Sequence, residues 1–197
     1  NGMVRPEDVK PFAGKIRAES ARMTSLVEDI INLTKLDNGG AEMTWEDCDL
    51  YRIAENAVDS LMTTAEAENV KLDLSGGHAM VYGVPQQLYS IVYNLCDNAI
   101  KYHTAEGKVW VRVNQDASGV TLQVQDNGIG IPEDCQDRIF ERFYRVDKSR
   151  SKAAGGTGLG LSIVKHAVLI HKAYIQVRSK PGIGSEFTVF FPNRKEK

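Results

Sequence analysis

Asn94, Asn98 and Lys101 recur at three- and four-residue steps in the stretch NLCDNAIKYH, which runs from Asn94 to His103. In a helix with this spacing the three side chains project from one face. Asparagine is a mediocre helix former because its amide competes for backbone hydrogen bonds, so two of them one turn apart ask for a reason. Amide oxygens are hard ligands suited to Mg²⁺, and a lysine ammonium is suited to phosphate. The pattern makes a nucleotide-phosphate site a candidate, although a solvated polar face is the commoner explanation of such a stretch.

A glycine-containing stretch, DNGIGIP, runs from Asp126 to Pro132 and carries further candidate chemistry. Its glycines allow the backbone to approach another group closely, and Asp126 is placed to accept a hydrogen bond from a ligand amine. Pro132 and the two acids after it predict that a helix starts there. Asn127-Gly128 alone would indicate a hairpin turn, which is the alternative.

A second such stretch, GGTGLGLSIVKH, runs from Gly155 to His166 and leads into an apolar helix. The free N–H groups and positive dipole end of such a helix N-terminus suit a phosphate. The stretch is not a Walker A loop, because no Gly-Lys-Ser/Thr follows. It also lacks the third glycine and the preceding strand of a dinucleotide-binding fingerprint. A flexible hinge is the alternative.

Aromatic and basic side chains lie together between the two glycine stretches, in IFERFYRVDKSRSKAAGG. A dense basic run is most often a solvated surface. The small residues and glycines that follow favour a mobile lid that closes cations over phosphates. The basic residues of this segment are Arg142, Arg145, Lys148, Arg150 and Lys152.

The composition is that of an ordinary globular protein. The 197 residues are 42% hydrophobic and 25% charged, with a formal net charge of −2 and a pI near 6.1. This balance gives no general attraction to nucleic acid or to an anionic membrane. Cys48, Cys96 and Cys135 form no CxxC pair, so they indicate reduced intracellular thiols, not disulfides or a zinc site. No apolar run approaches membrane-spanning length.

The first region that must position these residues is a long N-terminal helix. Apolar residues alternate there at three- and four-residue steps, which is typical of a coiled-coil or bundle seam, and Asn38 and Gly39 are signals for the helix end. A single helix cannot bury such a seam, so it must pack on the rest of the chain or on a second copy, and we expect the second copy. The seam residues are Val9, Phe12, Ile16, Met23, Leu26, Ile30 and Leu33.

After Gly40 the pattern becomes mixed. A short strand precedes a helix from about Leu50 to Glu68, and the strands NVKLDLS and AMVYG precede the Asn94 helix. Two strand pairs follow, KVWVRVN with VTLQVQ and IQVRS with EFTVFF. This order predicts an α+β fold with a mixed, largely antiparallel sheet and helices on one face, not a doubly wound parallel fold.

The stretches NLCDNAIKY, DNGIGIP, IFERFYR and GGTGLGLS resemble, in this order, the N, G1, F and G2 boxes of sensor histidine kinases of two-component systems. The resemblance covers residues 43–192 and is specific to the catalytic ATP-binding domain of that family. The helix with ESARMTSLVEDIINLTKLDNG also resembles the second helix of the dimerisation and histidine-phosphotransfer hairpin. It implies part of that hairpin in residues 1–40 and, in residues 41–197, a catalytic domain built as a two-layer α/β sandwich of the Bergerat type.

The resemblance also implies roles for single residues toward ATP and Mg²⁺. Asn98 and Asn94 would face Mg²⁺ and the triphosphate, and Lys101 would neutralise phosphate. Asp126 would accept a hydrogen bond from the adenine amino group.

The remaining implied contacts surround the adenine and the phosphates. Tyr102 would line the adenine, and Gly128 and Gly130 would make room for its ring. The F-box residues would lie in or beside the lid, and the G2 residues would wrap the phosphates. The whole ATP-binding set is Asn94, Asn98, Lys101, Tyr102, Asp126, Gly128, Gly130, Arg142, Arg145, Lys148, Gly156, Thr157, Gly158, Leu159 and Gly160.

In that family the γ-phosphoryl group of ATP is transferred to a histidine that an acidic residue follows, while Mg²⁺ and cations offset the phosphate charge. None of His78, His103, His166 and His171 has this context, so we expect the acceptor upstream of Asn1. We therefore expect this chain to bind Mg-ATP without phosphorylating itself properly. We expect the parent protein to be a homodimer through the hairpin and to pass the group to a response-regulator receiver domain. We also expect this part to lie in the cytoplasm, with membrane contact only through upstream regions.

Two other interpretations stay open at this point. A serine kinase that acts on an anti-sigma partner shares the nucleotide fold, although the heptad helix and FERFYR count against it. A non-catalytic nucleotide-binding signalling module is the second alternative. One departure from the family concerns the turn after His171, where two glycines are usual and this chain has Lys172 and Ala173.

Overall fold

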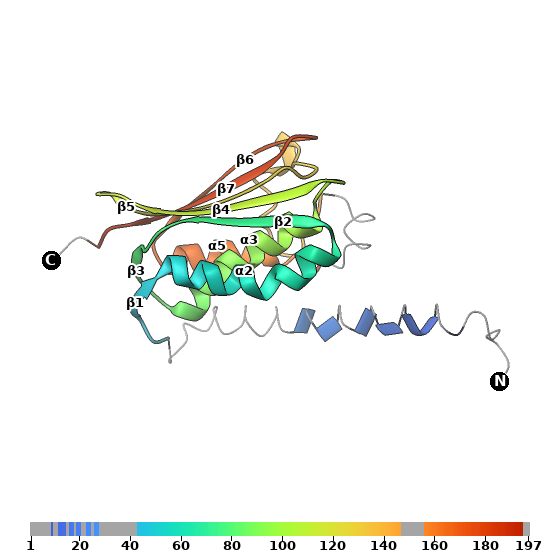
Figure 1. Cartoon of the computed structure of the whole chain (residues 1–197), viewed down its shortest axis with the longest axis horizontal. Coiled ribbons are helices and arrows are strands. Elements are labelled where there is room, and N and C mark those ends of the chain that lie inside the picture. Colours follow the sequence, from blue (N-terminus) through green and yellow to red (C-terminus); the bar gives the residue numbers. More distant parts are fainter. Residues whose placement is uncertain are drawn as a thin grey trace.

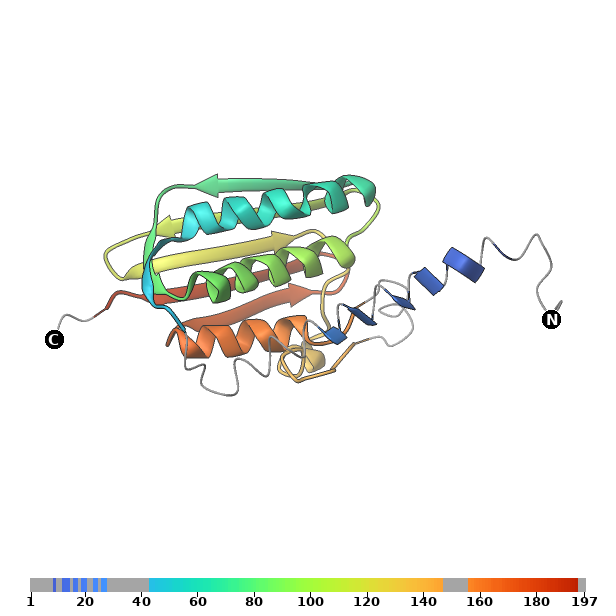
Figure 2. The ribbon, with the colours of Figure 1, turned by 90° about the horizontal axis from the view of Figure 1, so that it is seen from below.

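The helices α2, α3 and α5 cover one face of a five-stranded sheet (Figure 1). The computed structural model describes residues 43–146 and 156–194, together with residues 9, 12–14, 16, 17, 19, 20, 23, 24, 26 and 27. The helices are α2 (Leu50–Ala67), α3 (Pro85–Lys101) and α5 (Gly160–Ile170), and α3 lies between the other two (Figure 2). The predicted arrangement of helices on one face is confirmed.

The sheet is mixed and largely antiparallel, as predicted. Its strands lie in the order β2 (Val70–Gly76), β4 (Gly107–Gln115), β5 (Gly119–Asp126), β7 (Gly184–Pro192) and β6 (Tyr174–Lys180). Only the β2–β4 pair of this sheet is parallel. In β4 the residues Val109, Val111 and Val113 are buried, and the residues between them are at least partly exposed. This alternation places one face of the strand against the helices.

The amphipathic pattern of α3 explains its central position. Pro85 stands at the start of the helix, where its missing N–H is not needed. The apolar stripe predicted from the sequence is buried, and its residues are Leu88, Ile91, Val92, Leu95 and Ala99. Asn94, Asn98 and Lys101 remain half-buried on the neighbouring face. Burial of the stripe therefore fixes the direction in which these polar side chains project.

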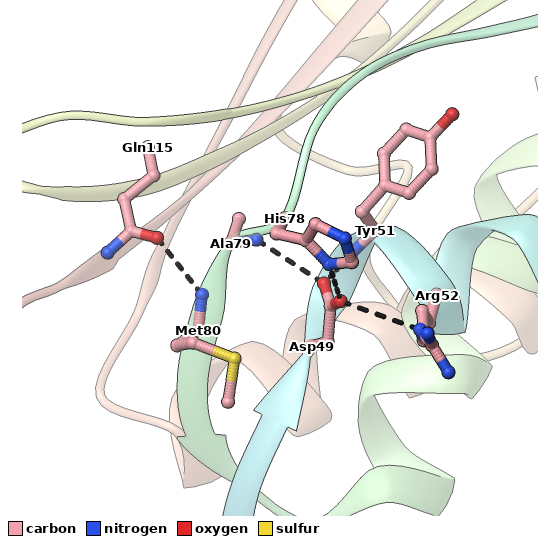
Figure 3. Close-up of polar contacts among 7 residues, drawn as sticks. All are labelled: Asp49, Tyr51, Arg52, His78, Ala79, Met80 and Gln115. Atoms are coloured by element: carbon pink, nitrogen blue, oxygen red, sulfur yellow. Dashed lines mark hydrogen bonds and ion pairs between the residues drawn. The ribbon is translucent and has the colours of Figure 1, made fainter.

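A separate antiparallel ribbon consists of β1 (Glu46–Asp49) and β3 (Met80–Gly83). The sequence indicates both strands but not that they pair with each other. The Met80 N–H donates to Oε1 of Gln115 at 3.1 Å, which joins the ribbon to the end of β4 (Figure 3).

The carboxylate of Asp49 joins three segments of the chain (Figure 3). Its Oδ1 accepts from the Tyr51 N–H at 3.1 Å and from the Ala79 N–H at 3.3 Å. Its Oδ2 contacts the ring of His78 and lies 3.9 Å from Nε of Arg52. Asp49 is thus both the N-cap of α2 and the anchor of the β2–β3 loop.

The prediction of a helix after Pro132 is wrong, because only a single helical turn forms there. The structure has a 3₁₀ helix at Glu133–Cys135, and separate turns follow it. The side-chain amide of Gln136 donates to the carbonyls of Ile131 and Ser179, at 3.1 and 2.9 Å. These bonds hold the segment against the DNGIGIP loop and β6, an influence that the local sequence does not reveal.

The described residues between 9 and 27 are helical. Four members of the predicted seam are between 53% and 63% exposed, namely Val9, Phe12, Ile16 and Met23. Leu26, in contrast, packs against Leu159 and Ile163. Ile30 and Leu33 lie outside the described residues. The second copy of the chain and the boundary between residues 1–40 and 41–197 stay predictions.

The turn after α5 forms without the two glycines that the resemblance leads one to expect. Lys172 adopts the left-handed conformation at φ 53°, and the Ala173 N–H donates to the Val168 carbonyl at 3.0 Å. A left-handed conformation costs an L residue about 1–2 kcal/mol. The helix ends in the conformation a glycine would favour, with a lysine in that position.

His171 holds the end of α5 against the ribbon and the sheet. Its Nδ1 lies 2.7 Å from the Ala167 carbonyl, and its Nε2 accepts from the Val84 N–H at 3.0 Å. Nδ1 must therefore carry the proton of a neutral ring. The ring packs beside Trp45 and meets Phe191 edge-on, with centroids 5.1 and 6.2 Å away. Burial lowers the pKa of His171, against the opposing effect of the Ala167 hydrogen bond.

We expect the protein to lose stability as the pH falls below about 6.5, the ordinary pKa of histidine. Because the folded pKa of His171 is lowered, the unfolded chain takes up the proton first. The stabilising contribution is complete above that pH and is lost as the pH falls toward the folded pKa. Urea unfolding at several pH values measures this loss. His171→Gln should flatten the dependence of the unfolding free energy on pH, whereas an unchanged slope in this variant would contradict the assignment.

Candidate functional site

A pocket lies beside the polar face of α3, and all four of the quoted stretches contribute to its lining. The tertiary structure thus brings together residues that are up to 94 positions apart in sequence, from Tyr93 to Phe187. The predicted ATP-binding residues that line it are Asn94, Asn98, Lys101, Tyr102, Asp126, Gly130, Arg145, Gly156, Thr157, Gly158 and Gly160.

Three other predicted ATP-binding residues are described by the structure but do not line the pocket. Leu159 is fully buried and packs with Ile163, so its side chain belongs to the hydrophobic core. Gly128 and Arg142 are not among the lining residues, and Arg142 is exposed. Lys148 lies outside the described residues. For Leu159 a contact with phosphate could involve only the backbone.

Sequence reasoning missed about half of the lining. Asp97 could have been predicted from the sequence, because it stands four residues before Lys101 in a helical pattern. Ser185 could not have been predicted, because it belongs to β7 and lies 59 residues after Asp126 in the sequence. The missed residues are Tyr93, Asp97, Ala99, Ile129, Ile131, Ile139, Tyr144, Val146, Leu161, Ser185 and Phe187.

The α3 wall of the pocket presents an amide oxygen and an ion pair. The Asn94 Nδ2 group donates to the Ser90 carbonyl at 2.8 Å. The Asn94 Oδ1 atom faces the start of α5, since a Cβ added at Gly160 would lie 2.8 Å from it. Lys101 Nζ lies 2.6 Å from Oδ2 of Asp97. This wall therefore offers a hard oxygen ligand and a cation next to the glycine-rich loop.

Asp126 is fixed in place by the backbone. Its Oδ1 accepts from the Gly128 N–H at 2.7 Å and from the Ser185 N–H at 3.2 Å. Both of these bonds use the same oxygen, so Oδ2 is left to accept from another donor. Burial raises the pKa of Asp126, although the two N–H groups act in the opposite direction. The Asp126 carboxylate is thus a hydrogen-bond acceptor in the pocket that is fixed in position and largely shielded from solvent.

The glycines of DNGIGIP are required by the packing of the protein itself. A Cβ added at Gly128 would lie 2.4 Å from the Tyr102 carbonyl oxygen, and one at Gly130 would lie 2.1 Å from the Lys180 carbonyl oxygen. The Ile129 N–H donates to that Tyr102 carbonyl at 3.1 Å. The loop therefore lies directly on the end of α3 and on β6, which places Asp126 in the pocket.

The F and G2 stretches are joined to each other at the pocket. The Phe143 N–H donates to the Gly158 carbonyl at 2.9 Å, and Phe143 adopts a left-handed conformation at φ 63°. Two residues later the Nε and Nη2 atoms of Arg145 are buried, with no hydrogen-bond partner among the described residues. A buried guanidinium without acceptors is costly, so its position in the pocket wall suits an anionic ligand.

These side chains fit a nucleotide with a bound metal ion. Lys101 and Arg145 supply positive charge, Asp126 supplies an acceptor, and the α3 amides supply neutral oxygens. Within the described residues no group of three or more His, Cys, Asp and Glu side chains could hold a metal alone. Mg²⁺ is commonly held by few protein ligands together with substrate phosphates, which agrees with this donor set.

The sequence places the chain in a known family. Residues 83–195, more than half of the chain, match the model of the histidine kinase-, DNA gyrase B-, and HSP90-like ATPases. The chain belongs to this family, which supports ATP as the ligand of the pocket.

Within the family the chain is similar to sensor histidine kinases, which confirms the predicted resemblance. It is 37% identical over 187 residues to the sensor histidine kinase RppB of Synechocystis sp., covering 94% of this chain and 41% of that protein. It is 37% identical over 189 residues to the sensor-like histidine kinase SenX3 of Mycolicibacterium smegmatis, covering 95% of this chain and 49% of that protein. The chain thus spans less than half the length of these two relatives.

Solved structures have the same fold. The mycobacterial sensor histidine kinase MprB superimposes with a TM-score of 0.67 at 28% identity, over 77% of this chain and 99% of that one. Full-length ShkA, solved with AMPPNP, superimposes with a TM-score of 0.76 at 24% identity, over 98% of this chain and 41% of that one. The Bergerat-type sandwich predicted from the sequence agrees with these matches.

Proposed function

We propose that this chain is the ATP-binding catalytic part of a sensor histidine kinase that transfers the γ-phosphoryl group of ATP to a histidine. The observation that carries the proposal concerns Arg145, whose buried Nε and Nη2 atoms have no hydrogen-bond partner in the described part of the chain. Arg145 lines the same pocket as Asp126. A cationic group and a fixed acceptor in one pocket match the two ends of an adenine nucleotide.

In this proposal different residues bind the adenine, the phosphates and the metal ion. Oδ2 of Asp126 accepts from the adenine amino group, and Tyr102 lines the ring. Lys101 and Arg145 neutralise the phosphates, together with the N–H groups of the glycine-rich loop. The amide oxygens of Asn94 and Asn98 would hold Mg²⁺, which would offset the phosphate charge.

In the proposed reaction the bond between the γ-phosphorus and its bridging oxygen breaks, and a bond from that phosphorus to an imidazole nitrogen forms. ADP leaves with the bonding electron pair. None of the four histidines of this chain lines the pocket, and His171 is held between protein groups. We place the acceptor histidine outside this sequence, on the hairpin of which residues 1–40 would be part.

We propose a homodimer through the helical hairpin, a response-regulator receiver domain as the final acceptor, and a position in the cytoplasm. None of the helices that the structure describes is long and apolar enough to cross a membrane.

Calorimetric titration with ATP, with and without Mg²⁺, tests the proposal, and GTP is the control. We expect ATP to bind, Mg²⁺ to strengthen the binding, and GTP to bind far more weakly. If ATP does not bind under either condition, the proposal fails and a non-catalytic signalling module becomes the better explanation. If GTP binds as well as ATP, the role of Asp126 in adenine recognition fails.

A further inference from the structure

The ion pair between Asp97 and Lys101 occupies the wall of the pocket where the phosphates would lie. Lys101 Nζ and Asp97 Oδ2 are 2.6 Å apart, and the two side chains are 32% and 19% exposed. Both residues line the pocket. An i,i+4 pair that is mostly buried in a pocket wall is less screened by solvent than a pair on the open surface.

This pair conflicts with the binding of a bare triphosphate. If Lys101 leaves the pair to contact phosphate, the Asp97 carboxylate is left without its cation beside a polyanion. If Lys101 stays in the pair, the phosphates lose a cation. The other carboxylate of the described lining, Asp126, is held by the N–H groups of Gly128 and Ser185 and cannot take over the lysine.

A divalent cation removes this conflict. Asp97 directly precedes Asn98 and follows Asn94 by three residues, so all three side chains project from neighbouring positions of α3 into the same pocket. A carboxylate is a preferred ligand of Mg²⁺, directly or through a bound water. With Mg²⁺ beside Asp97, Lys101 is free to contact phosphate, and every charge has a partner.

We propose, on the basis of the proposed function, that Asp97 is a positioning residue that makes the pocket select metal-loaded over metal-free ATP. Without nucleotide, Asp97 holds Lys101. When Mg-ATP binds, the Asp97 carboxylate leaves Lys101 and contacts the metal ion. The Lys101 ammonium then contacts a phosphate. No covalent bond changes in this exchange.

Calorimetry with Asp97→Asn tests the exchange, using ATP in EDTA and ATP in excess Mg²⁺. In EDTA we expect the variant to bind ATP about tenfold more tightly than the wild type, because Lys101 is released and a repelling charge is removed. In Mg²⁺ we expect equal or weaker binding. The dissociation constant in EDTA divided by that in Mg²⁺ should therefore be at least about tenfold smaller in the variant than in the wild type. Adding Lys101→Gln to Asp97→Asn should abolish the gain in EDTA.

Two further variants separate this role from a structural one. Asp59→Asn removes the same charge from an exposed position of α2 and should leave the ratio unchanged. Asp97→Glu retains the carboxylate and should restore most of the metal dependence. A pair that only stabilises the helix would change neither dissociation constant noticeably. An unchanged ratio in folded Asp97→Asn, judged by its thermal melt, would overturn the exchange alone, whereas no ATP binding by the wild type would overturn the proposed function as well.

Discussion

Asp126→Asn should lose ATP affinity by roughly 100-fold, the largest effect that we expect from one substitution. The N–H groups of Gly128 and Ser185 bind Oδ1 and would keep the amide oxygen of the asparagine in that place. The amide NH₂ would then point at the adenine amino group, donor against donor. Loss of a hydrogen bond to a charged group costs about 1.5–3 kcal/mol, and the facing donors add to this. Calorimetric titration with ATP and GTP measures the change.

Asp116→Asn is the matched control for this variant. Asp116 also accepts from backbone N–H groups, those of Ser118 and Gly119, but it lies in the β4–β5 turn away from the pocket. Its substitution should leave ATP affinity unchanged. If ATP and GTP bind Asp126→Asn as they bind the wild type, Asp126 does not recognise adenine.

Asn98→Ala should lower the affinity for Mg-ATP at least about tenfold while the affinity for ATP in EDTA changes little. Removal of even an outer-shell partner commonly costs a metal site ten- to a hundredfold, and Asn98 is proposed as a direct ligand. Alanine is the better helix former, so α3 itself should not be weakened by the change. Parallel titrations in Mg²⁺ and in EDTA give the two affinities.

Asn56→Ala provides the control, because Asn56 is exposed on α2 and lies outside the pocket. It tests whether replacing a helical asparagine has any general effect on binding. The metal role of Asn98 is excluded if Asn98→Ala and Asn56→Ala show the same dependence on Mg²⁺. Asn98→Ala and Asp97→Asn should also differ in EDTA, where only the latter gains affinity.

The sequence by itself determined the features that depend on neighbouring residues. The three- and four-residue spacing of Leu88, Ile91 and Leu95 predicts the buried stripe of α3, and burial of that stripe fixes where Asn94 and Asn98 project. Strand alternation likewise predicts the β4–β5 and β6–β7 pairs. The order of the four boxes was enough to predict the family.

Only the tertiary structure decided the features that depend on distant residues. Ser185 reaches Asp126 because β7 pairs with β5, and nothing near Ser185 in the sequence indicates this contact. The Nε and Nη2 atoms of Arg145 become buried, and Leu159 becomes a core residue, through the packing around them. Local patterns determine helix faces and strand alternation because those depend on backbone periodicity. The completed pocket depends on which strands and helices pack together, and that is a property of the whole chain.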